Sequence, residues 1–347
     1  MDEGRWSLWM TGSGPEHDVV LASRVRLARN VAGYAFPNSL GPEQGERLTG
    51  EIAQAVDELE GQWHLRLKRL QDVTALERQV LVEKHLASPL LVADPIRFEA
   101  LATDDRESIS IMVAEEDHLR MQVLLPGLQL EEAWIVADRL DDDLEQRLTW
   151  AFDAKLGYLT TYPTNLGTGM RASVMVHLPA LVLTRQAGPV FGALAQMGVV
   201  VRGLYGEGSE GEGHIFQISN QVSLGRTEEE LVHSLMMVAQ QVVGRERLAR
   251  EQLEKSAPVG LADRVGRAFG VLSHARVLSS EEALRLLSDV QLGIDLGHVK
   301  PFRDATFAEM VSMTRPGLLQ AMAGRELDPG ARDMLRAEVI QQHLDRS

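Results

Sequence analysis

The sequence predicts an α+β fold in which a sheet domain with flanking helices precedes a smaller all-α domain. Short apolar runs alternate with amphipathic helical patterns up to about residue 254, which is typical of a sheet covered by helices. Pro258 and Gly260 then interrupt a long helical pattern, and only helical patterns follow them. We therefore expect the sheet domain over residues 18–255 and the helical domain over residues 256–347.

The composition excludes several kinds of site. The 347 residues are 44% hydrophobic and 24% charged, which is enough for two globular domains. The lack of cysteine excludes disulfides, a thiolate nucleophile and cysteine metal sites. We find no signal peptide and no apolar run near the roughly 18 residues of a membrane helix, so we expect a cytoplasmic protein without a membrane partner. The net charge of −15 argues against nucleic-acid binding.

The first predicted strand, within residues 18–30, carries paired arginines. Arg24 and Arg26 follow an apolar run and lie two residues apart, with Arg29 farther along. On an extended segment Arg24 and Arg26 point to one face, where two guanidinium groups suit phosphate oxygens. The alternative is a surface strand that pairs with the acidic excess, and without context that reading is preferred.

Two helices are predicted next, over residues 42–60 and 74–86. The first has proline near its start and one apolar stripe. The second begins at Thr74, which forms a capping box with the glutamate three residues later. His85 lies near its end, where a histidine is more often a cap than a ligand.

A charged turn, residues 115–120, lies between two predicted strands, over 107–113 and 119–125. It contains three carboxylates, a histidine and an arginine. Because unpaired buried charge is costly, these groups pair with each other or with a ligand if the turn is buried. A solvated acidic turn is the alternative, and the hexapeptide alone favours it. The long helix over 131–152 follows, and we interpret its aspartates 141–143 as a solvated face.

Arginines recur at the ends of the later strands. Arg171 begins a strand that follows a Gly-Thr-Gly turn, and Arg202 ends the strand over 199–202. Together with Arg24, Arg26 and Arg120 they suggest one polyanion site, for which a nucleoside triphosphate is the natural ligand. The glycine-rich residues 203–213 are interpreted as a lid that closes on a substrate. The remaining predicted elements are a helix over 179–197, a strand over 215–219 and helices over 227–254, 261–273, 280–291, 304–313 and 329–345.

The last predicted helix carries Arg332 and Arg336, which are four residues apart and therefore on one face. Such a pair could hold a phosphate group. A solvated helix face is the alternative, and the pattern alone does not separate the two.

Four segments together resemble the catalytic domain of the phosphagen (guanidino) kinases. They are residues 23–30, 115–120, 163–171 and 202–203, and their order and spacing agree with that family over about residues 18–250. The resemblance implies an antiparallel sheet domain.

Within the family, the chain is similar to a bacterial branch that phosphorylates arginine in proteins. Only 22 residues precede Ser23, so we expect no counterpart of the helical front domain that the small-molecule kinases carry. Residues 202–207 resemble the lid motif of that branch, and residues 332–337 resemble its phosphoarginine-sensing motif.

The resemblance implies two catalytic carboxylates, an ATP site and a phosphoarginine pocket. Glu116 matches the family's catalytic glutamate, and Glu207 matches a loop carboxylate that faces the guanidinium. No protein ligand for Mg²⁺ is expected, since the family holds this ion through phosphates and water. The residues expected to bind ATP are Ala22, Ser23, Arg24, Val25, Arg26, His85, Arg120, Arg171, Ala172, Ser173, Val174, Met175, Arg202, Gly203, Leu204, Tyr205, Gly206 and Glu207. Those expected to bind phosphoarginine are Arg332, Asp333, Met334, Leu335, Arg336 and Ala337.

Two positions depart from the family pattern. Tyr162 stands where most members have a cysteine whose thiolate helps orient the target guanidinium, and Ala114 replaces an asparagine before the charged turn. The first departure concerns the positioning of the target, and the second is a milder change.

The resemblance implies an activity and its partners. The enzyme would transfer the γ-phosphoryl group of ATP, with Mg²⁺, to arginine side chains exposed on proteins, and so mark them for Clp-type proteolysis. Implied partners are a zinc-binding activator protein, a heat-shock repressor and a Clp unfoldase and protease, and the chain would form a homodimer or higher homo-oligomer. Two alternatives stay open: a small-molecule kinase acting on free arginine, and an inactive adaptor that reads phosphoarginine.

Overall fold

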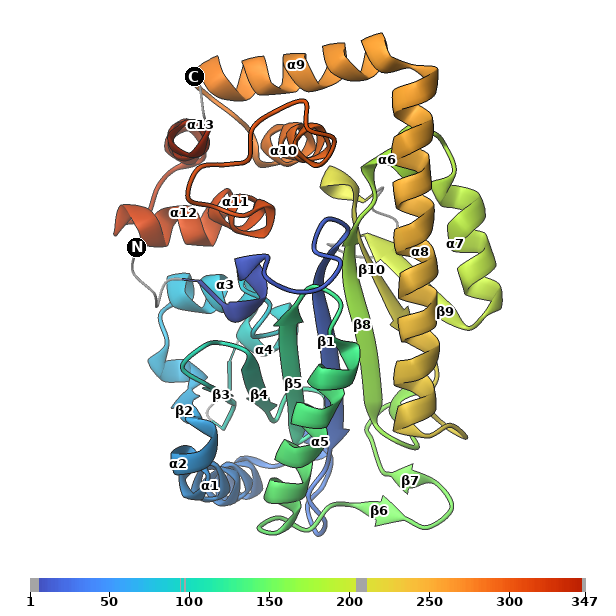
Figure 1. Cartoon of the computed structure of the whole chain (residues 1–347). Coiled ribbons are helices and arrows are strands. Elements are labelled where there is room, and N and C mark those ends of the chain that lie inside the picture. The colour runs from blue at the N-terminus through green and yellow to red at the C-terminus, as the bar shows by residue number, and fades with distance from the viewer. Residues whose placement is uncertain (1–5, 94, 97, 204–210, 345–347) are drawn as a thin grey trace.

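The computed structural model of the protein describes residues 6–93, 95–96, 98–203 and 211–344 (Figure 1). Its centre is an eight-stranded sheet with the order β2-β3-β4-β5-β1-β8-β10-β9. Neighbouring strands all pair in the antiparallel sense, as the family resemblance implied. The strands are β1 (Val20–Arg29), β2 (Arg66–Arg69), β3 (Ala100–Thr103), β4 (Ile109–Val113), β5 (Leu119–Pro126), β8 (Met170–His177), β9 (Val199–Gly203) and β10 (Ile215–Asn220), while β6 (Phe152–Asp153) and β7 (Gly157–Tyr158) form a separate pair.

Helices of the first domain flank this sheet. Figure 1 shows α5 and α8 lying across one face, with α1 beside the β2 edge. None of the helices in the described parts of the chain is long and apolar enough to cross a lipid bilayer. The helices are α1 (Pro42–Glu58), α2 (Glu60–Trp63), α3 (Ala75–Glu83), α4 (Pro89–Ala93), α5 (Leu130–Glu145), α6 (Pro179–Leu183), α7 (Ala187–Gln196) and α8 (Glu228–Ser256).

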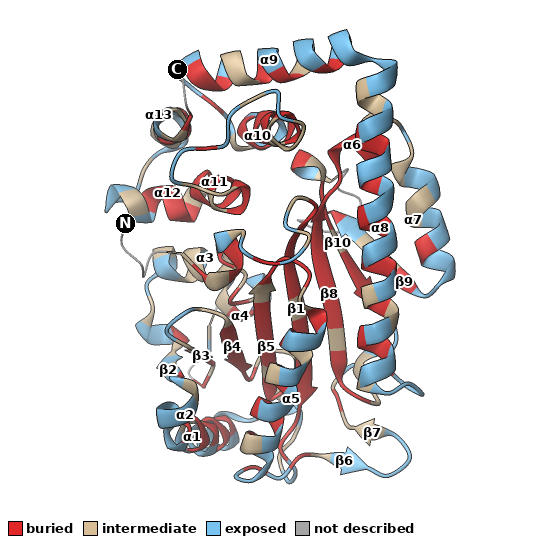
Figure 2. Ribbon diagram, viewed as in Figure 1, coloured by how far each residue is buried: buried red, intermediate tan, exposed pale blue. Residues whose placement is uncertain are grey.

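The C-terminal part of the chain is all helical. Its helices stack at one end of the sheet domain, with α11 and α12 next to α3 and the N-terminal segment. Figure 2 shows buried residues on both sides of this junction. One apolar cluster contains Trp9, Leu21 and Met175 together with Leu284 and Phe307. Because the two parts share this core, the boundary between residues 255 and 256 stays a prediction. The helices are α9 (Pro258–His274), α10 (Ser280–Asp295), α11 (Phe307–Met313), α12 (Pro316–Ala323) and α13 (Pro329–His343).

Alternation along β1 gives the sheet two different faces. Val25 and Leu27 are buried in the main core beneath α5, whereas Arg24 and Arg26 point to the opposite face. Arg29 lies on the core side with Val25, so it does not join the other two arginines.

Asp141 corrects one interpretation made from the sequence. We expected it on a solvated helix face, but it is buried on α5 and forms an ion pair with Arg29, with 2.5 Å between Nη2 and Oδ2. It lies one helical turn after Ala137, on the stripe that faces the sheet.

Several predicted boundaries also differ. The helix expected over 131–152 ends at Glu145, and the helix expected over 179–197 is two helices. Arg185, with a φ of 59°, separates α6 from α7 because this left-handed conformation cannot continue a helix. The edge strand β2, its neighbour β3 and the helix α12 were not predicted.

Candidate active site

The polar face of the sheet gathers side chains from four neighbouring strands. Arg26 on β1 is opposite Gln122 on β5 and Arg171 on β8, and Arg24 is opposite Ser173. These residues share a face because the strands are antiparallel and in register. Gln217 on β10 extends the set, since its side-chain oxygen accepts a hydrogen bond of 2.9 Å from Arg24.

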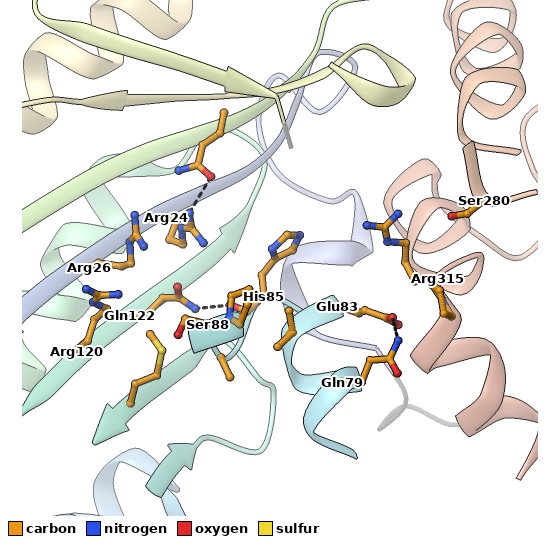
Figure 3. Close-up of a pocket in the computed structure, with 16 residues that line it drawn as sticks. Arg24, Arg26, Gln79, Glu83, His85, Ser88, Arg120, Gln122, Ser280 and Arg315 are labelled. Carbon is orange, nitrogen blue, oxygen red and sulfur yellow. Dashed lines mark hydrogen bonds between the residues drawn. The ribbon is translucent and has the colours of Figure 1, made fainter. Parts of the chain in front are cut away.

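This face forms a wall of a cavity of about 590 Å³ (Figure 3). Arg24, Arg26 and Arg120 lie together on one side of it, and His85 projects from the end of α3 near the middle. The volume is in the range of pockets that bind small molecules and cofactors.

Positive charge is crowded at the arginine side of this cavity. Burial, and then the neighbouring charges of Arg171 and Arg120, lower the pKa of Arg24 to about 10. Burial, and then the charges of Arg24, Arg120 and Arg171, lower the pKa of Arg26 well below its ordinary value. Burial and then Arg202 lower the pKa of Arg171. The Nε atoms of Arg26 and Arg171 are buried without a hydrogen-bond acceptor among the described residues. A bound polyanion would relieve this repulsion and satisfy these donors.

Arg120 differs because two carboxylates hold it. Its Nη1 lies 2.8 Å from Glu115 Oε2, and its Nη2 lies 2.6 Å from Glu116 Oε2. Burial alone would lower the pKa of Arg120, but Glu115 and Glu116 together raise it. The other oxygen of Glu116 accepts a hydrogen bond of 3.0 Å from Asn165. The predicted charged turn is therefore a paired cluster rather than a solvated loop.

A second cavity of about 270 Å³ adjoins the first. Arg26 and Arg120 line both, and the smaller one adds Glu116, Tyr162 and Arg171. A phosphate chain between these arginines would therefore have one end next to the Glu116 carboxylate.

Comparisons with known proteins agree with this geometry. Residues 47–249 match the model of the ATP:guanido phosphotransferase C-terminal catalytic domain, and residues 258–347 match that of the protein-arginine kinase McsB C-terminal domain. The protein-arginine kinase of Moorella thermoacetica is 50% identical over 343 residues, which cover 98% of each chain. That of Symbiobacterium thermophilum is 52% identical over 341 residues, covering 97% of this chain and 96% of the relative. The chain belongs to the protein-arginine kinase family.

Solved structures of related kinases have the same fold. A duplicated taurocyamine kinase from Schistosoma mansoni with bound transition-state analog components aligns with a TM-score of 0.60 and 27% identity, over 68% of this chain and 34% of that one. Lombricine kinase aligns with a TM-score of 0.60 over 71% of this chain and 70% of its own, at 23% identity. The second likeness supports the fold only.

The charged turn of this kinase is held in place by a buried network behind it. Asn30 donates to Asp117 over 2.7 Å and accepts from the backbone N–H of His118 over 2.8 Å. Asp117 also accepts from the N–H of Thr161, over 2.7 Å, which ties the turn to the segment with Tyr162. Ala114 opens the turn with a φ of 59°, a conformation that asparagine tolerates better than alanine.

His85 follows the C-terminal end of α3 and has a left-handed conformation, with a φ of 61°. Burial, and then the charges of Arg24 and Arg315, lower the pKa of His85 to about 3, so its ring is neutral at pH 7. Trp9 packs edge-on against the ring at 5.4 Å between centroids and donates to the carbonyl of Lys84 over 3.1 Å. A neutral imidazole ring that is held in position by Trp9 is suited to stack on an aromatic ligand.

The structure brings only part of the predicted ATP set to the cavities. The side chains of Ser23, Val25, Ala172 and Val174 point to the core face, where the Ser23 hydroxyl donates to the carbonyl of Gly127. Ala22 and Met175 lie in the apolar cluster shared with the C-terminal helices. Arg202 is opposite Gln217, and Gly203 ends β9. The predicted residues Leu204, Tyr205, Gly206 and Glu207 lie outside the described residues.

The C-terminal motif has two different arginines. Arg336 is 1% exposed and donates to the carbonyls of Thr314 over 2.8 Å and Leu278 over 2.7 Å, and also to Asp333. Arg332 is half-buried one turn earlier on α13. Met334 is exposed, Leu335 is half-buried and Ala337 is buried. Phosphoarginine binding by these residues stays a prediction.

Sequence reasoning missed several residues of the site. Gln122 and Gln217 follow the same alternation as the arginines, so strand register could have found them. Asn165 lies within the resembling segment 163–171, and its contact with Glu116 is visible only in three dimensions. Arg315 lines the larger cavity from the C-terminal domain, with no local signal in the sequence.

Proposed function

We propose that this kinase transfers the γ-phosphoryl group of ATP to a guanidinium nitrogen of arginine side chains in proteins. The observation that supports it best is that the arginine-lined cavity and the cavity containing Glu116 share Arg26 and Arg120. ATP in the first would place its terminal phosphate beside an acceptor in the second. The names of the full-length relatives favour protein arginine as that acceptor.

The acceptor is a poor nucleophile, because an arginine guanidinium has a pKa of roughly 13.8 and no free lone pair. Glu116 can orient one nitrogen and accept its proton as the N–P bond forms and the bond to the β-γ bridging oxygen breaks. The pairing of Glu116 with Arg120 and Asn165 positions the carboxylate for this role. Glu207 is proposed, by family resemblance, to face the guanidinium from the other side.

The remaining catalytic work is charge stabilisation. Phosphoryl transfer depends on positioning and on neutralising the phosphate oxygens. Arg24, Arg26, Arg120 and Arg171 supply this positive charge from one sheet face, and Arg202 lies close to Arg171. Since these groups are held on paired strands, little reorganisation is needed when the charge moves.

We also propose Mg²⁺ as the metal ion of the reaction. Glu115 and Glu116 each form an ion pair with Arg120. Among the residues that the structure describes, no three His, Cys, Asp or Glu side chains form a metal-binding group. The described residues therefore suit an Mg²⁺ ion that is held mainly by the phosphates of ATP, where it would offset their charge.

The wider role follows from the family resemblance alone. We propose marking of proteins for Clp-type proteolysis, and as partners an activator protein, a heat-shock repressor and a Clp unfoldase and protease. We propose a cytoplasmic homo-oligomer and a phosphoarginine pocket at residues 332–337 on the same basis.

One assay separates this function from its rivals. The kinase is incubated with labelled ATP and Mg²⁺ together with an unstructured arginine-rich protein, and in parallel with free arginine. We expect acid-labile label on the protein. Label on free arginine alone would indicate a small-molecule kinase. If phosphoarginine binds but no transfer occurs to either acceptor, the protein is an adaptor instead.

A further inference from the structure

The far wall of the larger cavity comes from the C-terminal domain. Arg315, Pro316 and Ser280 line it together with the first-domain arginines. Figure 3 shows Arg315 and Ser280 on the side opposite Arg24, Arg26 and Arg120, with His85 between the two groups. The cavity is therefore closed by both domains.

The backbone on either side of Arg315 is held in place. Arg336 on α13 donates to the carbonyl of Thr314 over 2.8 Å. Glu83 at the end of α3 accepts hydrogen bonds of 2.8 Å from the backbone N–H groups of Gly317 and Leu318. Arg336 belongs to the C-terminal domain and Glu83 to the first domain. Arg315 therefore has a defined position where the two domains meet.

The direction of ATP in the cavity follows from the proposed transfer reaction. The γ-phosphate must lie where the two cavities meet, at Arg26 and Arg120, because Glu116 is on the other side of that junction. The adenosine must then lie at the opposite end. Arg315 also lines a small recess with His85 and Met175, two of the residues predicted to bind ATP.

We propose that Arg315, from the C-terminal domain, binds the adenosine part of ATP opposite the ring of His85. This inference rests on the proposed function. A guanidinium is planar, always charged and able to stack on an aromatic face. Adenine between a neutral imidazole and a guanidinium has a flat partner on each side, while the arginines of the sheet bind the phosphates. Bound nucleotide then contacts both domains, and Arg336 on α13 helps to position Arg315 through its hydrogen bond to the carbonyl of Thr314.

The test compares equilibrium binding of three probes: ATP with Mg²⁺, AMP, and tripolyphosphate. The full-length variants are R315A, R315K and, as a matched control, R325A. Arg325 is an exposed arginine that follows α12 in the same domain. R315A is expected to weaken binding of ATP and AMP about tenfold and to leave tripolyphosphate within twofold of the parent. R315K keeps the positive charge but lacks the planar guanidinium group, so it should recover only part of the AMP affinity. R325A should change nothing.

Other outcomes overturn the inference. AMP binding by R315A at parental affinity would show that Arg315 does not contact adenosine. An equal loss for tripolyphosphate would place the guanidinium on the phosphates. If R315A does not fold, parental AMP affinity in R315K would contradict the proposed stacking. A parent protein that binds no ATP would refute the proposed function itself. If Arg24→Ala loses ATP binding but R315A binds ATP at the parental affinity, only this inference is refuted.

Discussion

Arg29 and Asp141 form a buried ion pair between the sheet and α5, with 2.9 Å between Nε and Oδ2 and 2.5 Å between Nη2 and Oδ2. Arg29 also donates to the carbonyl of Thr168 over 2.9 Å and stacks on the ring of Tyr158 at 3.4 Å. This arginine therefore connects the core to the segment that carries Tyr162 and Asn165, rather than binding a ligand.

Replacing Asp141 by alanine should destabilise the fold by about 3–5 kcal/mol, because it leaves the Arg29 charge buried without a partner. Urea denaturation measures the change. Asp142→Ala is the matched control, since Asp142 is the exposed neighbour on the same helix and its loss should cost less than about 0.5 kcal/mol. Equal effects of the two substitutions would show that the ion pair contributes little.

Glu116→Gln should lower kcat for protein arginine by about 10² to 10⁴, since the amide cannot accept a proton. ATP binding should stay near the parental value because the sheet arginines are unchanged. Single-turnover kinetics measure the rate of phosphoryl transfer, and parallel calorimetry measures the affinity for ATP. Transfer at the parental rate would remove Glu116 from the role of base.

Arg171→Ala should weaken nucleotide binding or transfer, because it removes one of the guanidinium groups of the proposed phosphate site. In the described structure Arg171 contacts Ser219, at 3.1 Å, so the fold should survive the change. Steady-state kinetics with varied ATP measure the effect, with the exposed Arg139 on α5 replaced by alanine for comparison. If KM and kcat match those of Arg139→Ala, Arg171 is not part of the site.

Ala114→Gly should cost about 1–2 kcal/mol less than the same change at an unstrained buried alanine, since glycine adopts the φ of 59° without steric cost. Ala102, a buried alanine of β3 without this conformation, is the control, and its change to glycine should destabilise. The midpoints of urea denaturation of the two variants are compared with that of the parent protein. A loss of stability in Ala114→Gly comparable to that in Ala102→Gly would show that Ala114 is not strained.

The two motif arginines of α13 should behave differently. Arg332→Ala should abolish binding of free phosphoarginine, measured by calorimetry, without lowering the melting temperature. Arg336→Ala should also destabilise the C-terminal domain, because the carbonyls of Thr314 and Leu278 lose their donor, at about 1–3 kcal/mol for each unpaired group. A parent protein that binds no phosphoarginine would refute the pocket.

Local patterns predicted the parts of the site that depend on strand periodicity. The two-residue spacing placed Arg24 and Arg26 on one face, and Thr74 does cap α3 with Glu77 as predicted. The phase of the α5 stripe would also have marked Asp141 as buried, but three consecutive aspartates suggested a solvated face.

Other features could not be predicted because they depend on contacts between distant segments. The approach of Arg315 to His85 joins segments more than 200 residues apart and leaves no periodic signal. The break at Arg185, by contrast, could have been predicted, because Gly188 and Pro189 follow it and the ring of a helical proline clashes with the carbonyl four residues earlier. The charged turn of residues 115–120 looked solvated because its partners, Asn165 and Ser88, lie elsewhere in the sequence.

The most direct test of the central claim identifies the residue that receives phosphate. An unstructured arginine-rich protein is incubated with ATP, Mg²⁺ and the kinase, and the products are mapped by mass spectrometry at neutral pH. We predict phosphate on arginine nitrogens, lost on brief acid treatment and nearly absent with Glu116→Gln. Phosphate on serine, threonine or tyrosine, or unchanged arginine labelling by Glu116→Gln, would contradict the proposed mechanism.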